Sequence, residues 1–481
     1  MLAGDYFTMG TRESNTKIFP SDPVAATYLF HLVESLRDEI SKAPENLKFS
    51  QAYCTAVSDL QRALQTEMKR EGSFTRWCSL WNRYHQLSRT MGSYLTESGS
   101  VATSYASMDE FWADMTAQEH GETRTTIWDT YEHGRRRQLE RIFAENYGSE
   151  AALLLNNGMS ALLVALWSSG LRYRASVLTG QQSYFETSQL LVQTLAPFRL
   201  KVLRVSLAGV PHVVRALRDY KPDIALLETA VNLPTGHVLE GYESWHQASS
   251  KTVFIIDNSV QSLLTRWFAK APDLSHRLLV VESCVKYLTQ DCMAGVIYGS
   301  AGLIERCRQV ARGIGLLLQA AAFNYLREGE IRNSHERLLL HSRNVSVFLN
   351  ELHSSSVRDA VYIGGIGHLE RARHDSDLLA NGVGAPVFVS ITTSRRKAAA
   401  IHRALLAEWQ RLAANNGLVI PVRAGFGWPE TTARVYESAV LNQADSPVYL
   451  RISIGIESPT VIREYARLLS LSLHSVLRGS L

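Results

Sequence analysis

The chain has 481 residues, of which 46% are hydrophobic, so it is long enough to form two or three packed domains with a sizeable core. Its 50 basic and 46 acidic residues give a formal net charge of +4, and the basic residues are spread along the chain apart from Arg135, Arg136 and Arg137. This balance gives no reason to expect nucleic acid as a partner.

Cysteine content and apolar runs indicate the compartment. The five cysteines are odd in number and lack metal-ligand or redox-pair spacing, which favours a reducing environment and no metal site. The first residues lack the basic and then apolar pattern of a signal peptide, and no apolar run approaches the roughly 20 residues that a membrane helix needs. We therefore expect a cytoplasmic protein without membrane contact.

Three helices are predicted at the start of the chain, over residues 24–40, 49–68 and 74–91. The third carries a stripe of side chains at helical spacing: Phe74, Trp77, Cys78, Trp81 and Tyr84. Such a stripe is typical of a helix that faces a core, although a ligand or partner surface is the alternative. The Ser-rich stretch 96–108 is expected to be a linker. Residues 1–104 are thus predicted to form a helical N-terminal extension.

From about Asp109 onward, short strand-like runs alternate with helical segments. Most of these runs lack a polar face: 175–180, 200–207, 223–229, 252–259, 278–284 and 294–300. Continuous apolar strands separated by helices predict a mainly parallel sheet that is covered on both faces. We expect this large α/β domain over residues 105–325. A smaller α+β domain is expected over 326–481, with strands in 385–394 and 448–458.

Polar side chains follow several of these runs, where the carboxyl ends of parallel strands meet at one rim. They are Asp257 after one run, Glu228 and Asn232 after another, and Ser283 and Lys286 after a third. Any one of them is more often a turn or capping residue than a catalyst. A lysine at a partly buried strand end, however, suits Schiff-base chemistry, because desolvation disfavours its ammonium form. A carboxylate on the next strand could keep a pyridinium nitrogen protonated, which points to a pyridoxal cofactor.

A phosphate site and a stacking residue should accompany such a ring. The polar turn Asn156–Gly158 opens a predicted helix near Met159, and backbone N–H groups at a helix start bind phosphate, although an ordinary capped helix has the same pattern. Ser283 could add a hydroxyl to the same phosphate. Tyr184 lies in a loop after the run 175–180, where it could stack on the ring and transfer protons, or serve only in packing.

From about Asp109 to Leu481 these residues resemble the pyridoxal-phosphate enzymes of cysteine and methionine metabolism, the cystathionine synthase and lyase group of fold type I. The sequence blocks quoted below occur in that family's order. The resemblance implies an α/β fold with a mainly parallel large domain and a small C-terminal α+β domain. It also implies pyridoxal 5'-phosphate as the cofactor and a homodimer or homotetramer, since the family's sites are built across a dimer.

The resemblance assigns roles residue by residue. "NNGMSAL" is similar to the phosphate turn, which makes Gly158 and Met159 backbone donors, and "YFET" places Tyr184 as the ring-stacking tyrosine. "ETAVNLPTG" puts Asn232 near the ring hydroxyl. "IIDNS" makes Asp257 the partner of the pyridine nitrogen.

The remaining blocks supply the cofactor-linked lysine and the arginine that binds the substrate carboxylate. "SCVKY" places Lys286 as the lysine joined to the cofactor, with Ser283 at the phosphate. "LRISIGIES" puts Arg451 where the family holds the substrate α-carboxylate, a task that suits an arginine's planar fork. "AGFGWPETTA" is similar to the block before it.

Departures from the family's pattern fall around the expected substrate pocket. They are Val285 in place of threonine, Gln290 and Asp291 in place of a Gly-His pair, and Gly425 in place of serine, with Trp428 after it. They suggest an altered pocket.

The upstream block that reaches a neighbouring subunit's phosphate is matched only loosely. In "TYEHGRRRQLE", Tyr131 is the candidate substrate-side tyrosine, but His133 occupies the place of an arginine. One of Arg135, Arg136 and Arg137 could supply the missing charge, or all three could lie on a solvated helix start.

The resemblance implies γ-replacement or elimination on an activated homoserine-type amino acid. The leaving group would belong to an O-acyl or O-phospho ester or to S-adenosylmethionine, and Lys286 would shuttle protons on the way to a vinylglycine-type intermediate. A second substrate would act as nucleophile, and the altered pocket makes a carbon or unusual nucleophile in specialised biosynthesis an option. The alternatives are a C–S lyase that acts by β- or γ-elimination and a cofactor-binding protein without turnover, with a regulatory or assembly role.

Overall fold

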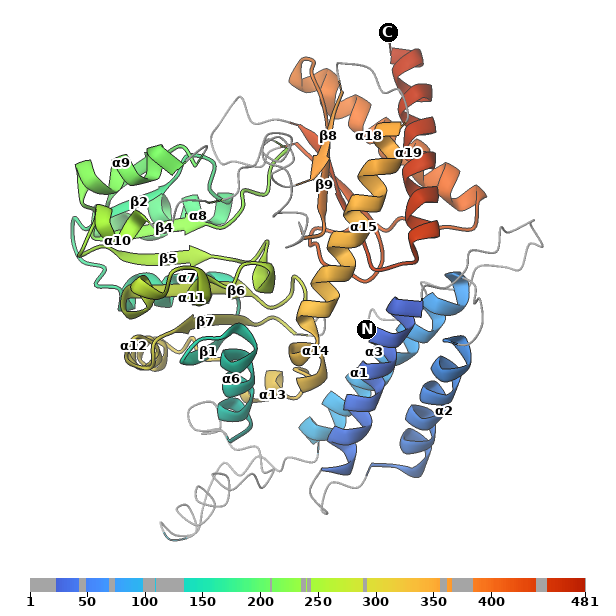
Figure 1. Ribbon diagram of the computed structural model, residues 1–481, viewed down its shortest axis with the longest axis horizontal. Coiled ribbons are helices and arrows are strands. Elements are labelled where there is room, and N and C mark those ends of the chain that lie inside the picture. The colour runs from blue at the N-terminus through green and yellow to red at the C-terminus, as the bar shows by residue number, and fades with distance from the viewer. Residues whose placement is uncertain are drawn as a thin grey trace.

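The computed structural model describes residues 23–42, 49–68, 74–97, 109, 134–207, 210–234, 239, 244–288, 292–354, 361–365, 384–437 and 448–480. Figure 1 shows three groups of elements: a helical group at the N-terminus, a large sheet with helices on both faces, and a smaller sheet packed against long helices. None of the helices in these ranges combines the length and apolarity of a membrane span.

All three predicted N-terminal helices are confirmed, as α1 (Pro23–Ser41), α2 (Gln51–Glu67) and α3 (Phe74–Glu97). They share one hydrophobic core with residues from the rest of the chain, including Ile456. The aromatic stripe of α3 faces this core, because Trp77, Trp81 and Tyr84 are each at most 4% exposed. At these three positions the stripe is therefore a packing surface and not an exposed ligand surface.

The large sheet has seven strands in the order β1-β7-β6-β5-β4-β2-β3. They are β1 (Ala151–Leu155), β2 (Ser176–Gly180), β3 (Lys201–Val205), β4 (Ile224–Glu228), β5 (Val253–Asp257), β6 (Leu278–Ser283) and β7 (Gly295–Gly299). Strands β3, β2, β4, β5 and β6 run parallel, whereas β7 is antiparallel to both β6 and β1. The predicted mainly parallel sheet is confirmed.

Helices cover both faces of this sheet (Figure 1). The helices in this part of the chain include α6 (Gly134–Tyr147), α7 (Gly158–Ser168), α8 (Phe185–Gln189), α9 (Val210–Tyr220), α10 (Trp245–Ala248), α11 (Trp267–Lys270), α12 (Ala301–Gly313), and α13 (Ala320–Phe323) and α14 (Glu328–Arg332), which pack on α6. Successive strand residues face opposite sides, so Phe254 and Ile256 lie in one core cluster and Ile255 lies in the other. This explains why the strands read as unbroken apolar runs.

The smaller sheet is antiparallel, with the order β10-β11-β9-β8. Its strands are β8 (Val361–Gly365), β9 (Pro386–Ile391), β10 (Thr432–Tyr436) and β11 (Tyr449–Ser453), and its long helices are α15 (Ser334–Ser354), α18 (Arg395–Asn415) and α19 (Pro459–Ser480). The predicted strands at 385–394 and 448–458 are confirmed as β9 and β11. The division at 325/326 stays a prediction, and the predicted boundary near residue 104 falls outside the described residues.

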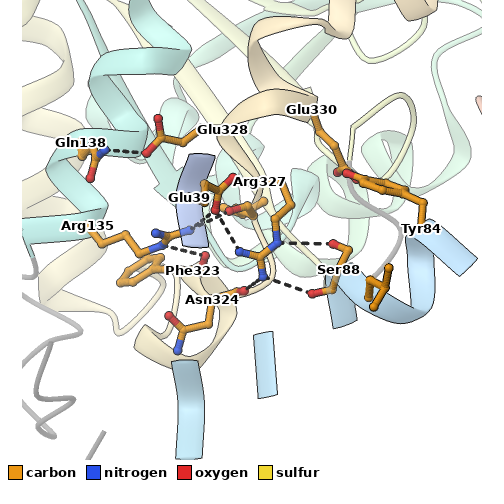
Figure 2. Close-up of polar contacts among 12 residues, drawn as sticks. Glu39, Tyr84, Ser88, Arg135, Gln138, Phe323, Asn324, Arg327, Glu328 and Glu330 are labelled. Atoms are coloured by element: carbon orange, nitrogen blue, oxygen red, sulfur yellow. Dashed lines mark hydrogen bonds and ion pairs between the residues drawn. The ribbon is translucent and has the colours of Figure 1, made fainter. Parts of the chain in front are cut away.

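A buried charge network fastens the N-terminal helices to the large domain (Figure 2). Glu39 of α1 accepts a hydrogen bond from Arg327 at 3.2 Å and pairs with Arg135 of α6 at 3.5 Å. Arg327 is 2% exposed and also donates to the hydroxyl of Ser88 in α3 at 3.3 Å. Other N–H groups of the two arginines donate to backbone carbonyls of Ser88, Phe323, Asn324 and Leu326.

Replacement of Glu39 by alanine should strongly destabilise the protein. The change would leave Arg327 buried without its carboxylate, and loss of one partner of a buried ion pair costs about 3 to 5 kcal/mol. Glu34→Ala is the matched control, because Glu34 lies exposed on the same helix. Urea unfolding measures both variants, and equal midpoints would contradict this role for Glu39.

Candidate active site

Lys286 lies in the turn after β6, where its surroundings disfavour the charged form. Its Nζ atom is 5.1 Å from the centre of the Phe426 ring. Burial lowers the pKa of Lys286, and the charge of Arg451 lowers it further, while the carboxylate of Asp257 acts in the opposite direction. A lysine with a lowered pKa is suited to imine formation and to proton transfer.

Asp257 ends β5 and is held by the turn that follows it. The backbone N–H of Ser259 donates to its Oδ1 atom at 3.0 Å. Burial raises the pKa of Asp257, and the bond from Ser259 and the charge of Lys286 oppose that rise. The Ser259 hydroxyl also accepts the N–H of Ser283 at 3.0 Å, so one short turn ties Asp257 to the strand that leads to Lys286.

The start of α7 is packed closely against the ends of β6 and β7. Asn157 caps the helix by accepting an N–H of the first turn at 2.8 Å. A Cβ atom on Gly158 would lie 2.9 Å from the Cβ of Ser283, and one on Gly295 would lie 2.2 Å from the carbonyl oxygen of Asn157. Glycine is therefore required at both positions. The first N–H groups of a helix, here those of Gly158 and Met159, suit a phosphate.

Tyr184 precedes α8 and is 38% exposed. Its backbone N–H donates to Oε1 of Glu228 at 2.5 Å, and Glu228 is the register partner of Asp257 on the neighbouring strand. Burial raises the pKa of Tyr184, Glu186 raises it further, and the charge of Arg451 partly offsets the rise. The phenol thus lies within electrostatic reach of Arg451.

Arg451 comes from β11 of the smaller sheet and is 5% exposed. One of its terminal nitrogens donates to the carbonyl oxygens of Ala424 and of Gly425, the latter at 3.0 Å. Its Cζ atom lies 4.6 Å from the ring centre of Tyr436 and 5.5 Å from that of Phe426. Two carbonyls and two rings therefore fix the plane of a guanidinium that can bind a carboxylate.

Asn232 tests whether a cofactor with a ring hydroxyl fits here. Its Oδ1 atom is buried and has no hydrogen-bond partner among the described residues. A buried acceptor without a partner is costly, so a donor on a bound molecule would satisfy it. With the helix start at Gly158, the carboxylate of Asp257 and the amine of Lys286, the donor set fits pyridoxal phosphate.

The described residues do not include every candidate, and two candidates among them have other partners. Tyr131, His133, Gln290 and Asp291 lie outside the described residues. Arg135 takes part in the Glu39 network, and Arg136 is 1% exposed, where it donates to the carbonyl of Leu318 and lies 5.0 Å from the Phe323 ring centre. Both arginines are thus engaged within this chain, so neither lies on a solvated helix start. Arg137 is exposed.

Sequence reasoning missed several neighbours of the cluster. Phe426 lies close to both Lys286 and Arg451, and Tyr436 covers Arg451. Phe426 stood inside a recognisable block, so its place beside Gly425 was a usable signal. Tyr436 carries no local signal, because it reaches Arg451 only through the pairing of β10 with β11.

The fold and this donor set define a pyridoxal-phosphate enzyme of fold type I. The sequence matches the Cys/Met metabolism PLP-dependent enzyme family over residues 87–462, and the chain belongs to that family. No curated protein gives a match to the sequence. The expected family, fold, cofactor and enzymatic nature are confirmed.

Two solved structures show the same fold. Both are cystathionine gamma synthase from Xanthomonas oryzae pv. oryzae, one in complex with aminoacrylate and cysteine and the other in complex with cystathionine. Each is 19% identical to this chain, with a TM-score of 0.59, and the match covers 74% of this chain and 90% of the other. At this identity the likeness concerns the fold.

The free energy of unfolding should fall as the pH rises, because the buried carboxyl of Glu228 ionises. Burial, the charge of Asp257 and the opposing bond from Tyr184 leave the pKa of Glu228 at about 8, against about 4.3 in an unfolded chain. A carboxyl with a raised pKa stabilises the fold below the unfolded value, and that contribution is lost as the pH rises towards 8. Glu228→Gln keeps an acceptor for Tyr184 but cannot ionise.

Urea unfolding at pH 5.5 and pH 8, with saturating cofactor, measures this effect. Wild type should lose up to about 1.4 kcal/mol per pH unit through this group, and Glu228→Gln should show a correspondingly smaller loss. Glu305→Gln, at an exposed position on α12, should keep the wild-type pH dependence. An unchanged pH dependence in Glu228→Gln would argue against the raised pKa.

Proposed function

We propose that the protein catalyses γ-replacement or γ-elimination on an activated homoserine-type amino acid, such as an O-acyl or O-phospho ester or S-adenosylmethionine. One observation carries the proposal: Lys286 from the large domain and Arg451 from the smaller sheet flank the same Phe426 ring, at 5.1 and 5.5 Å. A proton-transfer group and a carboxylate-binding group then act on the same amino acid.

The roles follow from the charges of these groups. Arg451 would hold the α-carboxylate, and the neutral amine of Lys286, favoured by its lowered pKa, would take the α-proton. Asp257 would keep the ring nitrogen of the cofactor protonated. When bound, pyridoxal phosphate supplies an electron sink for the carbanion.

Later steps need a proton shuttle and a departing group. Lys286 would first pass the α-proton on to the bound cofactor; neutral again, it would take a proton from the β-carbon, and the leaving group would depart from the γ-carbon with its bonding electrons. The phenol of Tyr184 would be protonated near neutral pH, as in any tyrosine, and because burial raises its pKa further it would donate a hydrogen bond to the departing group without giving up its proton. A second substrate that adds at the γ-carbon would give replacement, and release without addition would give elimination.

Gly425 and Trp428 support a substrate choice that differs from relatives with serine at position 425. A Cβ atom on Gly425 would lie 3.0 Å from Nε1 of Trp428, so a larger residue would press on the indole. That nitrogen is buried without a hydrogen-bond partner in the described part of the chain. Since the Gly425 carbonyl also holds Arg451, this altered contact lies next to the proposed carboxylate site.

Replacement of Lys286 tests the cofactor attachment. Wild type with pyridoxal phosphate should show a visible absorption band that Lys286→Ala lacks, while Lys251→Ala, at an exposed lysine, should keep it. O-acyl-homoserines and S-adenosylmethionine are then added separately, and wild type should consume one of them. Identical spectra for wild type and Lys286→Ala would refute the proposed role of Lys286, and release of a thiol from a thioether amino acid alone would favour a C–S lyase.

Arg451→Lys should weaken substrate binding more than the chemical step. Lysine keeps the charge but loses the planar fork, and a hydrogen bond to a charged group contributes about 1.5 to 3 kcal/mol, so KM should rise roughly tenfold or more. Arg434→Lys is the matched control, because Arg434 is the exposed register partner of Arg451 on β10. Steady-state kinetics with the substrate that wild type consumes measure KM for both variants. Equal KM values would argue against binding of the substrate carboxylate by Arg451.

A further inference from the structure

Arg337 of α15 bonds two segments that meet at Lys286. It is 1% exposed, and it donates to the carbonyl of Leu288 at 3.1 Å and to the carbonyl of Gly427 at 2.6 Å. Gly427 has a φ of +80°, and a Cβ atom there would lie 1.6 Å from the carbonyl oxygen of Lys286. The Gly427 loop therefore lies directly on the Lys286 backbone, and one guanidinium bonds both sides of this contact.

Aromatic residues of the N-terminal helices cover this guanidinium. The Cζ atom of Arg337 lies 6.0 Å from the centre of the Trp81 ring of α3, within the range of a cation–π contact. Tyr28 of α1 stacks on Trp81, with ring centres 6.2 Å apart and planes 16° apart. Burial raises the pKa of Tyr28 and the charge of Arg337 partly offsets this rise, so the phenol also lies near the guanidinium.

Both covering residues precede the part of the chain that matches the family. The match begins at residue 87, whereas Tyr28 lies in α1 and Trp81 lies in the part of α3 that precedes residue 87. The Glu39 network fixes these helices on the large domain (Figure 2), so the aromatic cover is held in place independently of the Lys286 turn. A residue outside the family match thus contacts the arginine that supports the lysine.

We propose that the N-terminal helices position the active-site lysine through Arg337. Trp81 and Tyr28 hold the guanidinium where it binds the carbonyls of Leu288 and Gly427, and these two bonds fix the backbone on which Lys286 sits. The inference rests on the proposed role of Lys286. The Arg451 guanidinium bonds to Ala424 and Gly425 of the same loop, so the test includes the visible band of the cofactor, which depends on Lys286 and not on the substrate carboxylate.

The test compares full-length, cofactor-loaded variants of one helical group. Trp81→Leu removes the aromatic face, Trp81→Phe keeps one, and Tyr53→Leu removes a buried aromatic residue of α2 that stacks on Phe49 instead. Two quantities are measured: the pH midpoint of the visible band of bound pyridoxal phosphate and the rate of α-proton exchange of L-homoserine in D₂O. The groups whose charges act on Lys286 are unchanged in all variants: Asp257, Glu186 and Arg451.

Trp81→Leu should shift the pH midpoint and slow exchange about tenfold, which corresponds to about 1.4 kcal/mol. Trp81→Phe should stay within about twofold of wild type, and Tyr53→Leu should keep the wild-type midpoint even if it melts earlier. Wild-type values in Trp81→Leu, or an equal shift in Tyr53→Leu, would overturn the inference.

A second variant keeps the inference testable if Trp81→Leu fails to fold. Arg337→Lys keeps a cation beneath Trp81 but cannot reach both carbonyls with one planar fork, so it should shift the midpoint in the same direction. Wild-type behaviour of Arg337→Lys would also overturn the inference. If Lys286→Ala shares the wild-type spectrum, both the proposed function and this inference fail, whereas a Lys286-dependent band that Trp81 and Arg337 do not affect refutes this inference alone.

Discussion

The close approach of Gly427 to the carbonyl of Lys286 is the contact on which the site depends. It brings the turn after β6 against a loop of the smaller sheet, so Lys286 and Arg451 reach the same Phe426 ring. The far end of that loop is fixed by Glu457, which accepts from the backbone N–H and the hydroxyl of Thr431. A side chain at position 427 could not fit, because its first atom would overlap the lysine backbone.

Burial then sets the charges of the site. It lowers the pKa values of Lys286 and Arg451 and raises those of Asp257 and Glu228. The charged form of each group is therefore less stable here than it would be in water. Such a cluster lowers the free energy of unfolding, and it is typical of functional sites. The buried Oδ1 atom of Asn232, which has no hydrogen-bond partner among the described residues, also costs stability, and a bound ring hydroxyl would satisfy it.

Besides the hydrophobic core that they share with Ile456, the N-terminal helices are attached by ionic and by aromatic contacts. Near the large domain the attachment is ionic, through Glu39, Arg135 and Arg327. Towards α15 it is aromatic, where Trp81 covers Arg337. These helices thus contact Arg337, which in turn bonds to the backbone next to the candidate lysine. A loosely tethered extension would make no such contact.

Local patterns in the sequence determined the elements and most of the candidate residues. The strands were predictable because they are apolar on both faces, and Asp257, Ser283 and Lys286 were noticeable because a polar residue after such a run interrupts the pattern. Departures such as Gly425 could also be recognised, because each falls within a block whose usual residue in the family is known.

Tertiary structure alone decided which distant residues meet. Nothing in the local sequence predicts that Trp81 contacts Arg337, that Arg337 bonds to Gly427 and that Gly427 lies against the Lys286 backbone, since each residue belongs to a different element. The sequence left the three arginines with two interpretations, a phosphate contact or a solvated helix start, yet Arg136 is buried because α6 packs it against the Phe323 ring and the Leu318 carbonyl. The physical reason is the same in each case: local patterns encode which face of an element is apolar, whereas the pairing of faces is fixed by packing between segments far apart in the chain.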